Sequence, residues 1–265
     1  MQTKQINFAK YSSIKIGSII EVEIIDDIKQ IEKSKVIIGG ANNLLISDTP
    51  PPLCMLSKEF DYIKIVDDRL VIGGAVKSSK IFNYCKRNDI AGFEFLGKLP
   101  GKLGGLVKMN AGLKSYEIFN DLISIKTYNG NIFKENIDYG YRKCNIDDMI
   151  YEASFQLQYG FDMSIAKQCD DMRANQPNMK EFPSAGSAFK NPKDDYAGRL
   201  IEAVGLKGFQ KGGAMFSTIH ANFLVNMGNA SFDDAIFLIN EAKKRVKDEF
   251  KIELQEEIRI IDNYN

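Results

Sequence analysis

The stretch Pro183-Ser-Ala-Gly-Ser187-Ala-Phe-Lys190-Asn-Pro192 is the segment around which the rest of the sequence can be arranged. It places the hydroxyl of Ser187 between a flexible Ser-Ala-Gly approach and a Lys-Asn-Pro exit. Glycine, asparagine and proline at these positions favour a tight exposed turn over the interior of a helix or strand. We therefore predict an exposed turn at Ser187, which can present a reactive side chain to a ligand.

Composition and charge indicate a globular protein without a general affinity for polyanions. The chain has 265 residues, 44% of them hydrophobic, and its 35 basic residues balance 35 acidic ones. This length accommodates one large domain or two to three small ones. A net charge of zero creates no global field toward nucleic acid or an anionic membrane, so neither is expected as a partner. Because no apolar run approaches the roughly 20 residues of a transmembrane helix and no signal peptide is evident, we expect a cytoplasmic protein. We also expect a monomer.

Cysteine and histidine usage argues against a metal centre. Cys54, Cys85, Cys144 and Cys169 lie far apart and form no Cys-x-x-Cys pair. We therefore predict reduced, mostly buried thiols and no zinc site. His220 is the only histidine, so neither a histidine-rich metal centre nor a conventional Ser-His-Asp triad is expected.

The N-terminal part of the chain alternates strands with glycine pairs. Apolar alternation predicts strands at residues 19–25 and 35–38, the second ending in Gly39-Gly40-Ala41-Asn42-Asn43. This ending is either a β-turn or a loop that brings backbone amides and asparagine side chains close to a ligand. Residues 62–75 predict a hairpin that closes on a second glycine pair, and residues 76–88 predict a helix.

Residues 92–112 form the segment richest in glycine and contain Pro100-Gly101-Lys102-Leu-Gly104-Gly105 and Asn110. Their spacing matches neither the Gly-x-Gly-x-x-Gly of a Rossmann crossover nor a Walker loop. A compact run of backbone donors with Lys102 and Lys108 nearby suits a pyrophosphate. The same composition can also serve a purely structural loop.

Downstream segments complete a mixed helix and strand pattern. Asn129-Gly130 predicts a hairpin over residues 122–134. The run Tyr139-Gly-Tyr-Arg142 sets an arginine among aromatic residues, where it is either an ordinary surface residue or a guanidinium held toward a carboxylate. We further predict strands at residues 149–158 and 214–226, helices at residues 164–175, 195–205 and from the cap-like Ser231 onward, and a linker at residues 177–183. A final alternating strand at residues 252–261 would send Glu257 and Arg259 to one face, and Ile258 and Ile260 to the other.

In this order the motifs resemble those of the UDP-N-acetylenolpyruvoylglucosamine reductases, flavoenzymes of bacterial peptidoglycan precursor synthesis and so of cell wall biogenesis. The resemblance extends over nearly the whole chain. The matching motifs are Ile38-Gly-Gly-Ala-Asn-Asn-Leu-Leu-Ile-Ser-Asp48, Pro100-Gly-x-x-Gly-Gly105, Met109-Asn-Ala-Gly112, Gly140-Tyr-Arg142, Ser184-Ala-Gly-Ser187-x-Phe-Lys-Asn-Pro192, Ala197-Gly-x-Leu-Ile201, His220-Ala-Asn-Phe-x-Val-Asn226 and Glu257-Ile-Arg259.

The resemblance implies an α+β fold. Residues 1–160 would be an FAD-binding region of the vanillyl-alcohol-oxidase (PCMH) type with two subdomains, and residues 161–265 a C-terminal α+β substrate-binding domain. The compact region between Tyr139 and Phe155 is similar to the smaller class of the family, which lacks a tyrosine-bearing loop. The residues implied to hold FAD are Gly39, Gly40, Ala41, Asn42, Asn43, Pro100, Gly101, Gly104, Gly105 and Asn110.

The resemblance also implies a mechanism with two half-reactions. NADPH first reduces FAD. The reduced flavin then passes a hydride to the enolpyruvyl group of UDP-N-acetylglucosamine enolpyruvate, which gives UDP-N-acetylmuramate. Ser187 matches the proton donor that quenches the resulting carbanion, and Arg142 and Glu257 match the pair that stabilises the enolate and positions the reacting groups. The chain departs from the family pattern at Lys102, where the family has threonine or serine, and at Asn175, where it has lysine. Arg173 or Lys190 could then supply the cation that Asn175 lacks.

Two other functions fit parts of the pattern. An FAD-dependent alcohol or hydroxyacid oxidase would share the cofactor fold but would typically use a histidine or tyrosine base. A flavin or nucleotide-sugar binding protein without catalysis would not require Ser187, Arg142 and Glu257 together. The three side chains disfavour both alternatives.

Overall fold

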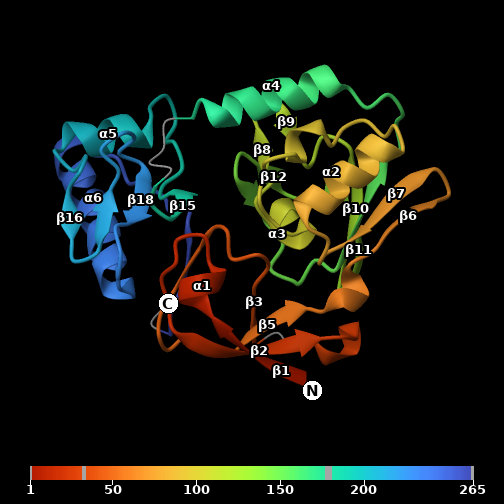
Figure 1. The fold of residues 1–265 in the computed structure, drawn as a ribbon, viewed down its shortest axis with the longest axis horizontal. Coiled ribbons are helices and arrows are strands. Elements are labelled where there is room, and N and C mark those ends of the chain that lie inside the picture. Colours follow the sequence, from red (N-terminus) through yellow and green to blue (C-terminus); the bar gives the residue numbers. More distant parts are fainter. Residues whose placement is uncertain (1, 32–33, 177–180, 264–265) are drawn as a thin grey trace. The chain divides into compact units, whose positions relative to one another are not determined.

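The computed structural model describes residues 2–31, 34–176 and 181–263, and the chain divides into two compact units (Figure 1). The first unit comprises Met1–Lys4, Val22–Gly40 and Pro52–Gln176, and the second comprises Gln5–Glu21, Ala41–Pro51 and Pro177–Asn265. Both units mix helices and strands, which confirms the α+β class. The assignment of residues 1–160 and 161–265 to cofactor and substrate stays a prediction.

The first unit holds most of the strands. Its elements are η1 (Ile28–Gln30), β3 (Val36–Ile37), β5 (Leu53–Leu56), η2 (Lys58–Phe60), β6 (Ile63–Val66), β7 (Arg69–Gly73), α2 (Ser78–Arg87), η3 (Glu94–Leu96), α3 (Leu103–Lys108), β8 (Gly112–Leu113), β9 (Tyr116–Glu117), β10 (Leu122–Thr127), β11 (Gly130–Phe133), η4 (Lys134–Asn136), β12 (Tyr139–Gly140), β13 (Lys143–Cys144), β14 (Glu152–Gln156) and α4 (Met163–Ala174). Strands β1 (Gln2–Asn7) and β2 (Ile19–Ile25) each cross the division along the chain.

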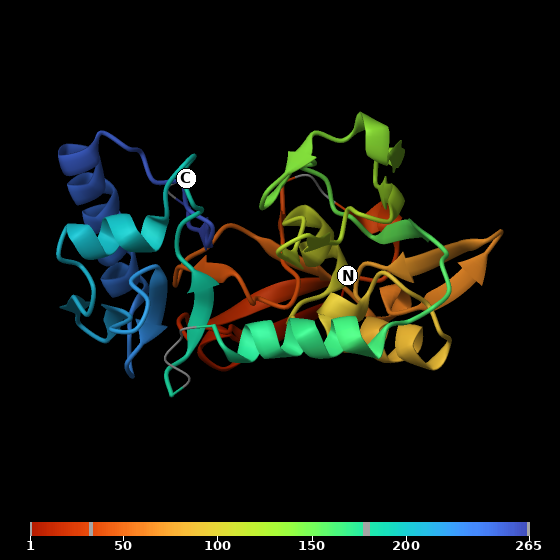
Figure 2. The same ribbon diagram turned by 90° about the horizontal axis from the view of Figure 1, so that it is seen from above.

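An antiparallel five-stranded sheet, in the order β11-β10-β14-β7-β6, is the main layer of this unit. Its hairpins follow the local sequence. The predicted hairpin forms between β10 and β11, but Thr127 pairs with Gly130, so the two-residue turn is Tyr128-Asn129, and Gly130, with a φ of +116°, is the first residue of β11. Asp67 and Asp68 both adopt positive φ angles, 46° and 58°, in the two-residue turn between β6 and β7. Figure 2 shows α4 on the same side of this unit as α2. Just before α4, Phe161 packs edge-on against Phe82 of α2, with 5.5 Å between the ring centroids.

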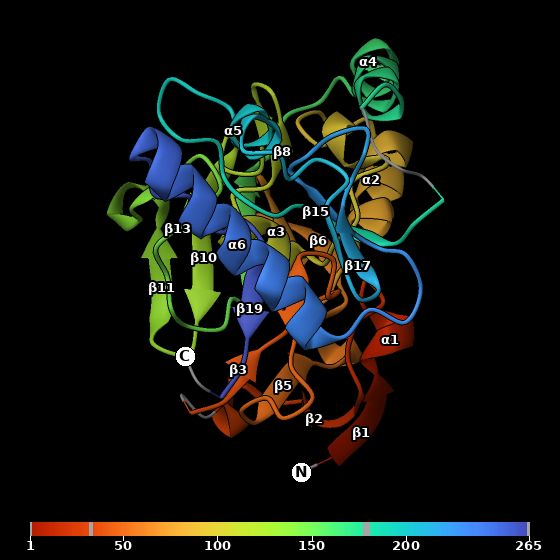
Figure 3. The ribbon, with the colours of Figure 1, turned by 90° about the vertical axis from the view of Figure 1, so that its left-hand side faces the viewer.

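The second unit combines a small antiparallel sheet with one long helix. Its elements are α1 (Phe8–Tyr11), β4 (Leu44–Ile46), β15 (Ser184–Ser187), α5 (Ala197–Ala203), β16 (Gln210–Lys211), β17 (Ala214–Phe216), β18 (Phe223–Asn226), α6 (Phe232–Phe250) and β19 (Arg259–Ile261). The sheet order is β15-β18-β17-β16, and β19 pairs in parallel with β4. Figure 3 shows α6 running across β17.

Helix α6 forms as its sequence predicts. Ser231 and Asp234 make a capping box, in which the Ser231 hydroxyl accepts from the Asp234 N–H at 3.1 Å and the Asp234 carboxylate accepts from the Ser231 N–H at 3.0 Å. Ala235, Leu238, Ala242 and Val246 are fully buried along one stripe, and Phe250 packs against the same core at the helix end.

Two expectations at the C-terminal side are wrong. Ser187 is the last residue of strand β15, because its backbone pairs with Phe223 of β18, so it does not lie in an exposed turn. The alternating strand expected at residues 252–261 is reduced to Arg259–Ile261, because the chain before it makes only scattered backbone bonds to residues 188–190. Ile258 and Ile261 are buried there, and Ile260 is only partly buried. The expected linker at residues 177–183 falls largely outside the described residues.

Other expectations are confirmed. Helices α2, α4 and α5 lie within a few residues of their predicted positions, and α4 is capped by Asp162, whose side chain accepts from the Ser164 N–H at 2.6 Å. All four cysteines are free and buried. Within the described parts of the chain, no helix has both the length and the apolar character needed to cross a membrane.

Asn226 ties the N-terminal part of the second unit to its sheet. Its amide nitrogen donates to the carbonyls of Ile14 and Lys15 at 3.1 and 3.0 Å, and its amide oxygen accepts from the N–H groups of Gly228 and Ala230. Only 6% of the residue is exposed, so solvent cannot replace these bonds.

We expect Asn226→Ala to lower the free energy of unfolding by about 3 kcal/mol, because several buried donors and acceptors lose their partner together. Urea denaturation measures this change. Asn240→Ala, at an exposed position of α6, is the matched control and should leave stability within about 0.5 kcal/mol or raise it slightly. Equal effects of the two changes would contradict the role of Asn226.

Candidate functional site

Ser187 is presented at an irregular edge of the second unit's sheet. Strand β15 pairs with β18 through Ser184↔Val225 and Ser187↔Phe223, so one strand has an extra residue between these two pairs. Gly186 lies in this irregular segment with a φ of +88°, a conformation that glycine adopts without a steric penalty. The Ser187 residue is half-buried. A bulge that re-aims a side chain is a common feature beside active sites.

Asn222 fixes the backbone that follows Ser187. Its amide oxygen accepts from the Phe189 N–H at 3.0 Å and its amide nitrogen donates to the Phe189 carbonyl at 2.8 Å. The Asn222 backbone carbonyl accepts from the Ala188 N–H at 2.7 Å. Because Asn222 and Phe189 are buried, these bonds leave the position of Ser187 little freedom.

Glu257 is held next to Ser187 by the same backbone. The Glu257 N–H donates to the carbonyl of Ala188, the residue after Ser187, at 2.8 Å. The Glu257 carbonyl in turn accepts from the side-chain amide of Asn43 at 2.7 Å, and the Asn43 carbonyl accepts from the Arg259 N–H at 3.0 Å. The second unit therefore brings together Ser187 and Glu257 from the expected catalytic set and Asn43 from the expected cofactor set.

His220 serves the scaffold of the second unit. Its Nδ1 accepts from the Asn222 N–H at 3.1 Å, and its ring packs edge-on against Phe223 at 5.0 Å between centroids. A Cβ atom on Gly198 would lie 2.7 Å from the ring, so the imidazole is closely enclosed on that side. Burial lowers the pKa of His220. A neutral imidazole whose Nδ1 is already an acceptor is poorly placed to act as a base for Ser187.

Arg142 occupies a strained turn of the first unit, between β12 and β13, with a φ of 53°. Its guanidinium donates to the carbonyls of Gly112 at 3.1 Å and Asn110 at 3.4 Å, and it lies over the Tyr141 ring at 5.2 Å from the centroid. A left-handed backbone in a residue other than glycine is common at functional sites. Arg142 is thereby fixed against the segment that follows α3.

Asn110 supports Arg142 from inside the first unit. It is fully buried with a φ of 37°, and its side chain bonds Glu117, the Gly140 carbonyl and the Phe119 N–H. These contacts occupy its amide within the protein. Its contribution to a ligand site would therefore come through the loop that it holds.

The glycines expected to face a cofactor differ in their surroundings. Gly104 packs against backbone, since a Cβ atom there would lie 2.8 Å from the Ile150 carbonyl oxygen, and its N–H donates to the Gly74 carbonyl at 3.0 Å. Gly74 is equally enclosed, with its Cβ position 2.5 Å from the same Ile150 oxygen. Gly105 is exposed with nothing within 4 Å of its Cβ position, and at Gly39 the nearest atom is the Cβ of Lys102 at 3.9 Å. Only Gly39 and Gly105 of these four have room beside them.

The remaining expected cofactor residues are divided between the units. Gly40, the exposed Pro100, and Gly101, whose φ is +154°, belong to the first unit. Ala41 and Asn42 belong to the second, where the Ala41 carbonyl accepts from the Ser13 N–H at 3.0 Å and the Asn42 amide donates to the Ser13 hydroxyl at 2.9 Å. Ala41 has a φ of 51°, so this loop adopts the left-handed conformation that its Gly-Gly-Ala-Asn sequence allows.

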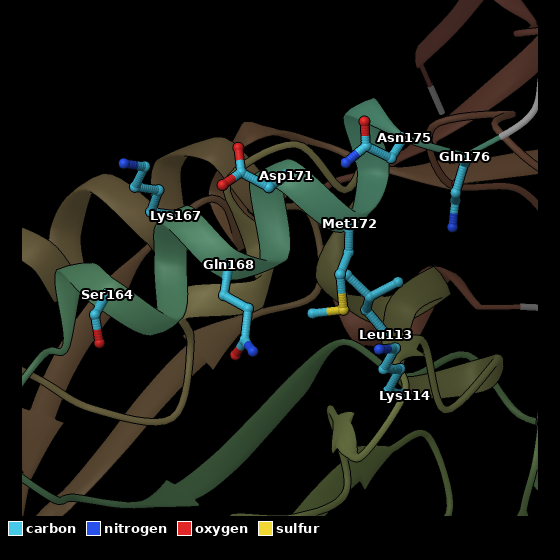
Figure 4. Close-up of a pocket in the computed structure, with 9 residues that line it drawn as sticks. All are labelled: Leu113, Lys114, Ser164, Lys167, Gln168, Asp171, Met172, Asn175 and Gln176. Atoms are coloured by element: carbon cyan, nitrogen blue, oxygen red, sulfur yellow. The ribbon is translucent and has the colours of Figure 1, made fainter.

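The sequence did not indicate a cavity of about 680 Å³ in the first unit, which Figure 4 shows between α4 and residues 113–114. Met172 and Leu113 point toward one another, and Lys114 lies beside Leu113 (Figure 4). The full lining is Leu113, Lys114, Ser164, Lys167, Gln168, Asp171, Met172, Asn175 and Gln176. Its size is that of a small-molecule site. The only feature of the sequence that relates to this cavity is the large number of polar residues in α4, and a helix that faces solvent has the same composition.

Comparisons with known proteins agree with the motif pattern. A family model described as UDP-N-acetylenolpyruvoylglucosamine reductase, C-terminal domain, matches residues 176–261. The UDP-N-acetylenolpyruvoylglucosamine reductase of Campylobacter jejuni is 50% identical over 97% of this chain and 99% of its own length. That of Helicobacter hepaticus is 49% identical over 98% and 100% of the two chains. The crystal structure of MurB from Thermus caldophilus superposes with a TM-score of 0.82 at 28% identity, covering 99% of this chain and 100% of that one.

The contrast between Gly104 and Gly105 gives a stability prediction. We expect Gly104→Ala to destabilise the protein by about 2 kcal/mol, because its Cβ would overlap the Ile150 carbonyl. Gly105→Ala, in the same helix but in open space, should be neutral or stabilising by up to about 1 kcal/mol. Thermal unfolding of the two variants checks the difference, and a destabilised Gly105→Ala would show that this position is not open.

Proposed function

Because this chain belongs to the UDP-N-acetylenolpyruvoylglucosamine reductase family, we propose that it reduces UDP-N-acetylglucosamine enolpyruvate to UDP-N-acetylmuramate in peptidoglycan precursor synthesis. The proposal includes bound FAD as cofactor and NADPH as the source of the hydride. The observation that carries it is the 50% identity to the Campylobacter jejuni reductase across 97% of the chain. The matched region of 261 residues extends over both compact units.

The open glycines support an FAD site. Gly39 and Gly105 leave room for a ligand beside the backbone, and the bond from the Gly104 N–H to the Gly74 carbonyl holds the start of α3, on which Gly105 lies. We assign cofactor binding to Gly39, Gly40, Ala41, Asn42, Asn43, Pro100, Gly101, Gly104, Gly105 and Asn110. When bound, FAD would supply the transfer of a hydride from NADPH to the enolpyruvyl carbon.

Ser187 is assigned as the proton donor to the substrate. A serine hydroxyl has a pKa far above neutral, so it gives up a proton only to a strongly basic centre. A carbanion beside the substrate carboxylate is such a centre. The bonds of Asn222 and Glu257 to the residues after Ser187 hold its backbone, which is what a positioned proton donor needs.

Arg142 and Glu257 are assigned to the enolate. An enolate oxygen needs preorganised positive charge or hydrogen bonds, and the Arg142 guanidinium is oriented by two backbone carbonyls and by Tyr141. Glu257 would position the reacting groups through its carboxylate. Its main chain is fixed at both ends of the residue, by Ala188 and by Asn43.

An absorbance spectrum of the purified protein, followed by anaerobic NADPH and then UDP-N-acetylglucosamine enolpyruvate, tests the function. A flavin spectrum that bleaches with NADPH and returns with the sugar is expected. Bound flavin that the sugar cannot reoxidise would favour an oxidase. A protein that binds no flavin even after reconstitution would favour a binding protein without catalysis.

Ser187→Ala should leave flavin binding and flavin reduction by NADPH intact and lower turnover about a thousandfold, because only the proton donor is lost. Stopped-flow absorbance separates the two half-reactions. Equal loss of both half-reactions in a natively folded variant would contradict the assignment of Ser187.

Glu257→Gln should lower turnover more than it weakens FAD binding, because the change removes the carboxylate charge and keeps the backbone bonds. Glu256→Gln is the matched control. Its carboxylate pairs with Lys243 at 2.7 Å near the surface, so its loss should change neither turnover nor flavin binding appreciably. Loss of flavin from Glu257→Gln would indicate a structural role instead.

A further inference from the structure

Lys102 is paired with a second lysine by the backbone of the first unit. It precedes α3, and an isolated antiparallel bridge sets it opposite Lys77, which precedes α2. Backbone bonds on either side fix this pairing, from the Ser78 N–H to the Gly101 carbonyl at 3.0 Å and from the Leu103 N–H to the Val76 carbonyl at 2.9 Å. Like charges directly opposite one another in such a pair destabilise the fold.

The charges around Lys102 offset this repulsion only in part. Lys4 and Lys77 both act on it with positive charge, and the carboxylate that acts on it is Asp61. Asp61 already pairs with Lys80 at 3.0 Å. Burial, followed by the charge of Lys77, lowers the pKa of Lys102. Among the described residues, no hydrogen bond or ion pair of the Lys102 ammonium is found, and the carboxylate that acts on it from a distance, Asp61, is shared with Lys80.

Two glycines with space at their Cβ positions lie close to Lys102. The nearest atom to a Cβ on Gly39 is the Lys102 Cβ at 3.9 Å, and Gly105 is three residues along the chain with nothing within 4 Å. At Gly39 and Gly105 there is therefore space for an anion beside the backbone near Lys102. A diphosphate carries two negative groups a few ångströms apart and can contact two neighbouring cations at once, which a single phosphate does less well.

We propose that Lys102 and Lys77 together bind the diphosphate group of FAD. This assignment rests on the proposed function for the identity of the dinucleotide. It gives a role to Lys102, the residue at which the chain departs from the small hydroxyl of its family, and to the placement of two lysines opposite one another.

Flavin titrations of the full-length protein freed of cofactor test the proposal. Lys102→Met keeps the side-chain length and removes the charge, so FAD affinity should fall about 10- to 100-fold. Riboflavin, which has no phosphate, should bind equally to both proteins. Lys102→Arg should stay near the wild type, and raising the salt concentration should weaken FAD binding to the wild type more than to Lys102→Met.

Lys77→Met gives an independent version of the test at an exposed position, and Lys86→Met on the same helix α2 is the control. Inorganic diphosphate should raise the melting temperature of the wild type and of Lys86→Met more than that of Lys77→Met or Lys102→Met. Unchanged FAD affinity in both Lys77→Met and Lys102→Met overturns the proposal and leaves the reductase function standing. A wild-type protein that binds no FAD overturns both.

Discussion

The hydrogen bond from the Gly104 N–H to the Gly74 carbonyl is the constraint on which the first unit's candidate site depends. It requires two backbones to approach so closely that neither residue can carry a side chain. The approach fixes where α3 begins and so sets the positions of Lys102 and Gly105. Gly73 and Gly74, at the end of β7, are thus needed for packing within the unit. Space for a ligand remains beside Gly39 and Gly105, which this packing does not enclose.

In the second unit, buried side-chain amides fix the positions of the candidate residues. Asn222 and Asn226 each satisfy both their donor and acceptor groups against backbone, so the residues that follow β15 and the start of the unit are held by side-chain amides. Such fully satisfied polar groups rigidify a structure locally. Ser187 can therefore sit at an irregular strand edge and still be well positioned, which a free loop would not achieve.

Local signals predicted the parts of the fold that local interactions determine. The cap at Ser231 and the hairpin between β10 and β11 depend on residues that are close in sequence, and both were predicted, although the turn lies one residue before Asn129-Gly130. Ser187 was misplaced because its strand exists only through pairing with residues nearly forty positions later. The glycines of the site looked alike in sequence, and only the tertiary neighbours separate the enclosed Gly104 from the open Gly105.

The use of His220 by the scaffold limits what chemistry Ser187 can perform. A serine nucleophile needs a nearby base to take its proton, and the only imidazole of the chain accepts a backbone N–H through Nδ1 and has its pKa lowered by burial. Without that base, Ser187 is better suited to giving a proton than to attacking a carbonyl. A reaction that generates its own strong base on the substrate, as reduction of an enolpyruvyl double bond does, is the kind of reaction for which such a serine suffices.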